Sequence, residues 1–221
     1  MSLDEASSTA AAATPDLKVD STERRLLDAA VRAFMHHGYA ATSIREIARE
    51  AGLTIGALYH YADSKEALFL RLVNDGYRWS IAAARAVAAR HEDPQERLLA
   101  LVRTHIEGEV AERDLWRISR TELNALTPDS QAKIIALRDA FESVWNEAII
   151  DGCSKGCFWP RDPTIARLSM VRMCTSVGDW YDPGGRLSLE EIVELMCQQT
   201  MDIMRPGTGA APLRRRRKHV G

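Results

Sequence analysis

The chain has 221 residues, of which 46% are hydrophobic and 27% are charged, and its formal net charge at pH 7 is -2. This composition is ordinary for a soluble globular protein, and the length suits one good-sized core or a small module attached to a larger one. A charge so close to zero indicates no partner by itself. The four cysteines form no C-x-x-C pair, which argues against a disulfide scaffold and against a zinc ribbon.

The N-terminal segment and the hydropathy of the chain bear on its location. No apolar stretch approaches the roughly 18 uninterrupted residues of a membrane span. Residues 1–20 carry acidic residues and alanines in place of the basic region and apolar core of a signal peptide. We therefore expect a cytoplasmic protein with no membrane partner. Residues 1–20 also hold almost no large apolar side chains, so we predict a disordered arm there.

From residue 21 to about residue 205 the apolar spacing is helical almost everywhere, which predicts an all-α fold. The first helix is indicated by one apolar stripe that stops at Gly38: Leu27, Ala30, Val31 and Phe34. A second stripe, which follows the capping box of Ser43 and Glu46, indicates the next helix: Ile44, Ile47, Ala48 and Ala51.

The turn after this second helix points to DNA binding. Only Gly52 and Leu53 separate it from a short helix that Thr54 can cap, and a glycine with positive φ lets two short helices cross steeply. This is helix-turn-helix geometry, although tight glycine turns also occur in helical proteins that bind no DNA. The region 21–67 contains six basic and six acidic residues, so binding would have to depend on the placement of donors and on a second copy.

The remaining chain, 68–205, predicts further helices. Three of them begin where a capping side chain precedes a proline, at Asp93-Pro94, Thr127-Pro128 and Asp162-Pro163. The strongest stripe comprises Ile134, Leu137, Phe141, Val144, Trp145 and Ala148. The last stripe follows a capping box of Ser188 and Glu191 and comprises Leu189, Ile192, Val193, Met196, Thr200 and Ile203. Residues 206–221 end in a basic run, which we predict to be a disordered, solvated tail.

Three segments of the N-terminal region resemble a known family. The stretches 38–48 (GYAATSIREIA), 51–61 (AGLTIGALYHY) and 64–68 (SKEAL) are closely similar to the TetR family of bacterial repressors. The resemblance implies a three-helix DNA-binding domain over 21–67 whose third helix enters the major groove of double-stranded operator DNA. It also implies a set of DNA-contacting residues: Thr42, Ser43, Arg45, Thr54, Ile55, Gly56, Ala57, Tyr59, His60 and Lys65. The family usually has phenylalanine where this chain has Ala62, so we expect a local repacking there.

The same resemblance implies a homodimer, in which the last two helices of each subunit form a four-helix bundle. An isologous interface suits a palindromic operator. In this chain those helices are predicted from about Pro163 to Tyr181 and from Ser188 to Met204. Their apolar residues are Met170, Met173, Val177, Ile192, Met196 and Ile203. These residues would either form the dimer interface or close the core of the monomer.

The C-terminal region of 68–205 is expected to bind a small-molecule inducer. The W-Y-x-P-G-G pattern at 180–185, with Gly152, Gly156 and Phe158, resembles TetR-type repressors of fatty-acid and steroid catabolism, whose inducers are acyl-CoA thioesters. Aromatic and methionine side chains suit an acyl pocket, which gives a candidate lining of Trp116, Phe141, Trp145, Met170, Met173 and Trp180. Arg172, Arg120 or Arg103 are candidates for meeting an anionic group.

No catalytic motif accompanies these features. We find no nucleophile elbow, phosphate-binding glycine loop, H-E-x-x-H pair or paired-carboxylate signature, so we expect neither an enzyme nor a cofactor. Cys153 and Cys157 lack a matching histidine or carboxylate set, so no metal is expected either. The favoured interpretation is a ligand-responsive repressor. The alternative is a helical small-molecule or acyl-CoA binding adaptor that does not bind DNA, and the salt dependence of DNA binding separates the two.

Overall fold

The computed structural model describes residues 21–205, and this range folds entirely into helices and connecting loops, as the apolar spacing predicts. The arm expected at 1–20 and the basic tail expected at 206–221 lie outside the described residues. The helices are α1 (Ser21–Ala41), α2 (Ile44–Glu50), α3 (Ile55–Tyr59), α4 (Lys65–Arg90), α5 (Pro94–Ala111), α6 (Arg113–Thr121), the short 3-10 helix η1 (Leu123–Ala125), α7 (Pro128–Ser154), α8 (Pro163–Trp180) and α9 (Leu189–Met204).

The predicted helix starts are confirmed because each depends on a local hydrogen bond. Both capping boxes form, at Ser43 with Glu46 and at Ser188 with Glu191. At α3 the Thr54 hydroxyl accepts from the amide of Ala57 at 3.1 Å. The three proline-led helices also begin as expected, with side-chain caps from Asp93, Thr127 and Asp162.

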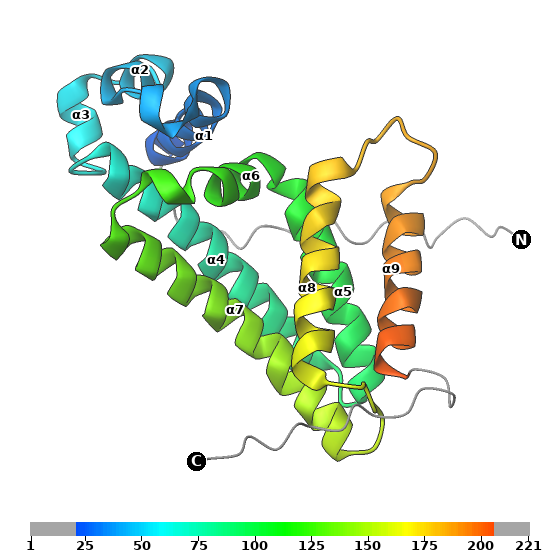
Figure 1. Ribbon diagram of the computed structural model, residues 1–221. Coiled ribbons are helices and arrows are strands. Elements are labelled where there is room, and N and C mark those ends of the chain that lie inside the picture. Colours follow the sequence, from blue (N-terminus) through cyan, green and yellow to red (C-terminus); the bar gives the residue numbers. More distant parts are fainter. Residues whose placement is uncertain (1–20, 206–221) are drawn as a thin grey trace, which may run out of the picture.

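The helices divide between two apolar cores that α4 connects. Figure 1 shows α1, α2 and α3 gathered at one end of the molecule, while α4 and α7 run side by side toward the other end. One core lies under α1 to α3 and includes Phe34, Leu58 and Phe69. The second lies among α5, α7, α8 and α9 around Trp145. The first turns of α4 lie in the first core and Ala84 lies in the second, so α4 is packed into both.

The buried stripe of α1 differs by one position from the predicted one. Leu26, Ala29, Ala30, Ala33 and Phe34 are buried, whereas Leu27 and Val31 are only partly buried. Both stripes have helical spacing, so periodicity alone did not distinguish the face that packs on α2 and α4 from the flank beside it.

Within residues 21–205, the hydropathy of the helices also bears on membrane insertion. No helix in this range combines the length and the apolar character that a membrane crossing requires.

Candidate DNA-binding head and ligand cavity

The α2–α3 pair has the geometry that a helix-turn-helix requires. Gly52 between the two helices has φ of +68°, which is the left-handed conformation that glycine adopts without strain. The amide of Leu53 donates to the carbonyl oxygen of Ala48 at 2.8 Å, closing the turn. Ile47 and Leu58 are fully buried in the core that α1 and α4 complete. Packing on a shared core therefore fixes the angle at which α3 leaves α2.

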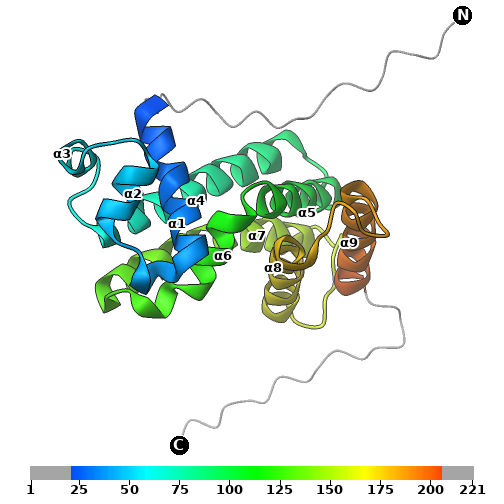
Figure 2. The ribbon, with the colours of Figure 1, turned by 90° about the horizontal axis from the view of Figure 1, so that it is seen from above.

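Most of the predicted DNA-contacting residues lie on the outer surface of this pair. Seven are exposed: Ser43, Arg45, Thr54, Ile55, Gly56, Tyr59 and His60. Ala57 is partly exposed. Ile55 is 41% exposed and Tyr59 is 49% exposed, although both could pack inside a core. Figures 1 and 2 show α3 at the free end of the molecule, where nothing in the described chain covers it. We call α1, α2 and α3, together with the core beneath them, the reading head, or simply the head.

Two further residues predicted to contact DNA have their polar groups bonded within the protein. The side chain of Thr42 is buried, and its hydroxyl bonds to the carbonyl oxygens of Gly38 at 2.7 Å and Ala33 at 3.2 Å. The Thr42 hydroxyl is therefore occupied within the protein, and its contact with DNA stays a prediction. Lys65 is only partly exposed, and its ammonium group donates to the carbonyl oxygens of Tyr39 at 2.6 Å and Thr42 at 2.9 Å. In this conformation Lys65 binds backbone and not phosphate.

Lys65 and Glu122 both bind the backbone of the turn that leads from α1 to α2. Gly38 has φ of +74°, and the next amide, that of Tyr39, donates to the carboxylate of Glu122 at 3.2 Å. The Lys65 ammonium takes the carbonyl oxygens of the same turn and lies 4.3 Å from the centre of the Tyr39 ring. The position of α2 therefore depends on one residue of α4 and on one that directly follows α6.

A cavity of about 220 Å³ lies where α4, α5, α6, α7 and α8 meet. Its apolar wall includes Leu101, Trp116 and Phe141. The ring of Trp116 packs edge-on against Tyr77 with centroids 5.0 Å apart. The cavity is therefore built mainly from the body of the molecule and reaches toward the reading head at α6.

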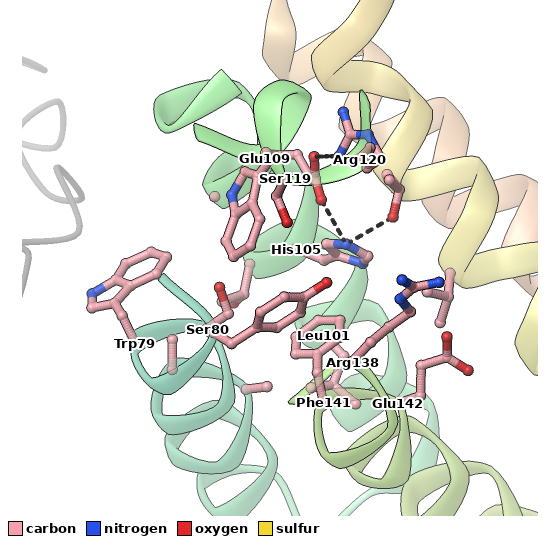
Figure 3. Close-up of a pocket in the computed structure, with 18 of the residues that line it drawn as sticks. Trp79, Ser80, Leu101, His105, Glu109, Ser119, Arg120, Arg138, Phe141 and Glu142 are labelled. Atoms are coloured by element: carbon pink, nitrogen blue, oxygen red, sulfur yellow. Dashed lines mark hydrogen bonds and ion pairs between the residues drawn. The ribbon is translucent and has the colours of Figure 1, made fainter. Parts of the chain in front are cut away.

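A chain of polar side chains crosses the cavity wall from α5 to α8 (Figure 3). His105 Nε2 lies 3.5 Å from a Glu109 oxygen and 3.3 Å from the hydroxyl of Thr175. The other Glu109 oxygen accepts from Arg120 at 2.9 Å, and Arg120 also donates to Asp179 at 2.7 Å. Burial lowers the pKa of Arg120, but the two carboxylates raise it above its usual value. This chain fixes α6 against α5 and α8.

The six predicted ligand-binding residues do not all reach the cavity. Trp116 and Phe141 line it. Trp145 and Met170 are fully buried in the core and do not line it. Met173 is partly buried and does not line the cavity, and Trp180 is 51% exposed on the surface. None of these four residues lines this cavity, and their role in ligand binding stays a prediction, because large apolar side chains serve equally in a core and in a pocket.

Only two of the three arginines predicted to meet an anionic group lie at the cavity. Arg172 and Arg120 line the cavity, whereas Arg103 pairs with Glu194 at 2.7 Å outside it. Sequence reasoning missed His105, Glu109 and Arg138 altogether. Their only signal was the i, i+4 spacing of His105 and Glu109, which many solvated helix faces share. Within the described range, no group of His, Cys, Asp or Glu side chains is arranged to hold a metal ion.

Helix α6 forms part of both the cavity and the core of the head. Trp116, Ser119 and Arg120 face the cavity, whereas Leu115 and Ile118 are buried in the core under α1 to α3. A Cβ atom at Gly76 of α4 would lie 2.9 Å from Leu115 and 3.2 Å from Trp116, which shows how closely α6 lies on α4. Any displacement of the cavity face of α6 therefore moves its other face within the head.

Helices α8 and α9 lie side by side at the edge of the molecule remote from α3 (Figure 1). Three residues predicted for a dimer interface, Met170, Val177 and Ile192, are buried within the monomer and so close its own core. Met173, Met196 and Ile203 are partly exposed. The apolar residues that these helices leave exposed are Ile165, Leu168, Trp180 and Leu195.

A helix-turn-helix head joined by α4 and α6 to a cavity-bearing helical body is the arrangement expected of a DNA-binding regulator that also binds a small molecule. Comparison with known proteins agrees. Residues 26–72 match the model of bacterial regulatory proteins of the tetR family, and residues 91–204, more than half of the chain, match the tetracyclin repressor-like C-terminal domain. The chain therefore belongs to the tetR family.

Individual relatives extend along most of the chain. The HTH-type transcriptional repressor KstR2 of Mycolicibacterium smegmatis is 28% identical over 182 residues, covering 80% of this chain and 89% of that protein. A tetR-family regulatory protein from Rhodococcus RHA1 is 25% identical with a TM-score of 0.76, covering 83% of this chain and 97% of the other. AibR, in a crystal structure with isovaleryl coenzyme A and operator DNA, is 29% identical with a TM-score of 0.71. The match covers 80% of this chain and 97% of the AibR chain.

Proposed function

We propose that this chain is a cytoplasmic transcriptional repressor that binds a palindromic operator as a homodimer and is released by a small molecule. The observation that carries the proposal is the double role of α6, which lines the cavity with Trp116 and Arg120 and packs Leu115 and Ile118 into the core of the head. A ligand that favours one position of α6 therefore favours one position of the head.

The exposed side chains of the head supply the contacts that DNA requires. Arg45 on α2 can reach base edges, while the hydroxyl group of Tyr59 and the ring of His60 can donate to phosphate oxygens. The Ser43 hydroxyl donates to Glu46 within the capping box. The short α3 presents its exposed side to the major groove, as in other helix-turn-helix proteins. Because the head is not broadly basic, two heads in one dimer are needed for tight binding.

The ligand acts through a difference in affinity between two arrangements of the heads. One arrangement of the heads fits successive major grooves and the other does not. The free energy by which the ligand weakens operator binding cannot exceed the difference between its binding free energies for these two arrangements. An acyl-CoA thioester is the first candidate, because a relative with a similar fold over most of this chain was crystallised with isovaleryl coenzyme A. The cavity, at about 220 Å³, holds only part of such a ligand, so the rest of the thioester would extend beyond its rim.

The test of DNA recognition is the double variant Tyr59→Ala/His60→Ala. Both side chains are exposed, so we expect operator binding to be lost while helix content and dimerisation stay as in the wild type. Electrophoretic mobility shift with circular dichroism and sedimentation would measure the three properties. The matched control is Arg90→Ala, an exposed residue at the distant end of α4. Wild-type operator affinity in the double variant would overturn the assignment of α3 as the recognition helix, whereas a wild-type protein that binds no operator would favour the adaptor interpretation.

A further inference from the structure

Positively charged side chains outnumber negatively charged ones around the cavity. Five of them line it, namely Glu109, Arg120, Arg138, Glu142 and Arg172. Both carboxylates are already in ion pairs, Glu109 with Arg120 and Glu142 with Arg167 of α8. Within residues 21–205, Arg138 and Arg172 have no carboxylate partner in the structure.

Arg138 is the less exposed of these two arginines and lies deeper in the wall. It is only partly exposed on α7, whereas Arg172 on α8 is exposed at the rim. Figure 3 shows the Arg138 side chain extending from α7 toward the His105 ring. An arginine that is withdrawn from water and lacks an anion is an unfavourable arrangement that a bound anion would relieve.

Tyr77 provides a second donor beside Arg138. Burial raises the pKa of the Tyr77 hydroxyl, while the charge of the nearby Arg138 guanidinium opposes that rise. A guanidinium cannot accept a hydrogen bond, so the phenol proton of Tyr77 remains available to an incoming oxygen. The edge-on contact with Trp116 fixes the Tyr77 ring. Two oriented donors, one of them charged, therefore face the same space.

The size of the cavity limits the rest of the ligand. At ~15–30 Å³ for each water-sized group, the cavity of about 220 Å³ accommodates roughly seven to fifteen non-hydrogen atoms. Leu101 and Phe141 provide an apolar surface for such a body.

We infer that the ligand presents an oxyanion to Arg138 and Tyr77 and packs a compact apolar body against Leu101 and Phe141. The inference rests on the proposed function only in taking this cavity as the inducer site. The oxyanion has two chemical sources, the carboxylate of a short organic acid or a phosphate of its CoA thioester. Arg172 at the rim lies where a group leaving the cavity would pass.

The test measures ligand binding directly, without DNA. Straight and branched carboxylic acids of four to ten carbons, their CoA thioesters and their neutral methyl esters are titrated into the full-length protein by isothermal calorimetry. The variants are Arg138→Met, Arg138→Lys and Arg172→Met. Arg78→Met is the matched control, because Arg78 is exposed on α4 directly after Tyr77 and does not line the cavity.

We expect at least one acid or thioester to bind tenfold or more tightly than its methyl ester. Arg138→Met should weaken that ligand about tenfold or more, the loss expected for a charge-assisted hydrogen bond, and should leave the ester unchanged. Arg138→Lys should restore part of the affinity. Binding of the free acid identifies a carboxylate, whereas binding of the thioester alone, weakened also by Arg172→Met, identifies a phosphate.

The inference is overturned if esters bind as well as anions, if Arg138→Met affects acids and esters alike, or if no acid or thioester of the panel binds. Retained ester binding and an unchanged thermal midpoint show that a variant is folded. None of these failures touches the DNA-binding assignment, because operator binding is measured without ligand.

Discussion

At the residue scale, single polar side chains determine how the head is assembled. The Lys65 ammonium donates to carbonyl oxygens of Tyr39, Ala40 and Thr42. These carbonyls follow the end of regular α1 geometry, where helical partners run out. Lys65 thus serves as a cap supplied by another helix, and its charge strengthens each bond.

The Lys65→Met variant tests this structural role. Removal of the ammonium leaves carbonyl oxygens of a partly buried turn without their donor, so we expect a loss of about 1–3 kcal/mol in the free energy of unfolding. Denaturant titration measures it, and operator affinity should fall with it. An unchanged unfolding midpoint combined with weak DNA binding would instead make Lys65 a phosphate contact, the role that family resemblance implies.

A glycine near the end of α7 makes a second residue-scale prediction. A Cβ atom at Gly152 would overlap the ring of Phe158, which is buried, and the surrounding core leaves the ring little room to move. Gly152→Ala should therefore destabilise the protein by about 1–3 kcal/mol, as measured by thermal unfolding. Gly56→Ala is the matched control, since nothing lies within 4 Å of that position. Equal midpoints for the two variants would contradict the packing described.

At the element scale, α6 is the feature that periodicity did not predict. Its N-cap residue Glu112 makes no side-chain hydrogen bond to the first turn, and the helix follows α5 after this single residue. The other helix starts were predictable because a cap or a proline marks them within three or four residues. The cavity was less predictable, because its polar wall brings together His105 of α5, Arg120 of α6 and Thr175 of α8, and only tertiary packing joins them.

The hydrogen bond from the Tyr39 amide to Glu122 connects the end of α6 to the head. Glu122→Ala removes the acceptor, so we expect the Tyr39 amide proton to exchange with solvent at least tenfold faster, as hydrogen exchange by NMR would measure. Glu122→Gln keeps a carbonyl oxygen at the same place and should retain most of the protection. Equal exchange in the wild type and Glu122→Ala would show that α6 does not hold this turn.

The same variant has a functional consequence. If α6 transmits the presence of ligand to the head, loosening its contact with Tyr39 should bring operator affinity with and without inducer closer together. Titration of labelled operator with the protein, once without inducer and once at saturating inducer, gives the ratio of the two operator affinities. An undiminished ratio in Glu122→Ala would place the coupling in α4 alone.

At the scale of the whole molecule, the family resemblance predicts a dimer through α8 and α9. Met170, Val177 and Ile192 are buried in the core of the monomer, so the dimer interface must be formed by the apolar residues of α8 and α9 that are exposed. Ile165 is 62% exposed and Leu195 is 44% exposed. Apolar exposure of this kind is typical of a surface that a partner covers.

The double variant Ile165→Glu/Leu195→Glu tests this interface. Charges placed on both faces would be buried without partners, so we expect monomers in sedimentation velocity and a large loss of operator affinity. The control is Ile135→Glu on α7, which is 43% exposed but lies outside α8 and α9. A stable dimer in the double variant would move the interface to another face.

The central claim is that this chain releases operator DNA when a ligand fills its cavity. The most direct measurement is fluorescence anisotropy of labelled DNA from upstream of its own gene, titrated with the protein at ~50 and ~200 mM salt, with and without acids and thioesters. We predict tight binding that weakens at least a hundredfold between those salt concentrations and that one ligand reverses. Absence of binding to that DNA and to the flanking intergenic regions, or binding that salt does not change, would contradict the claim.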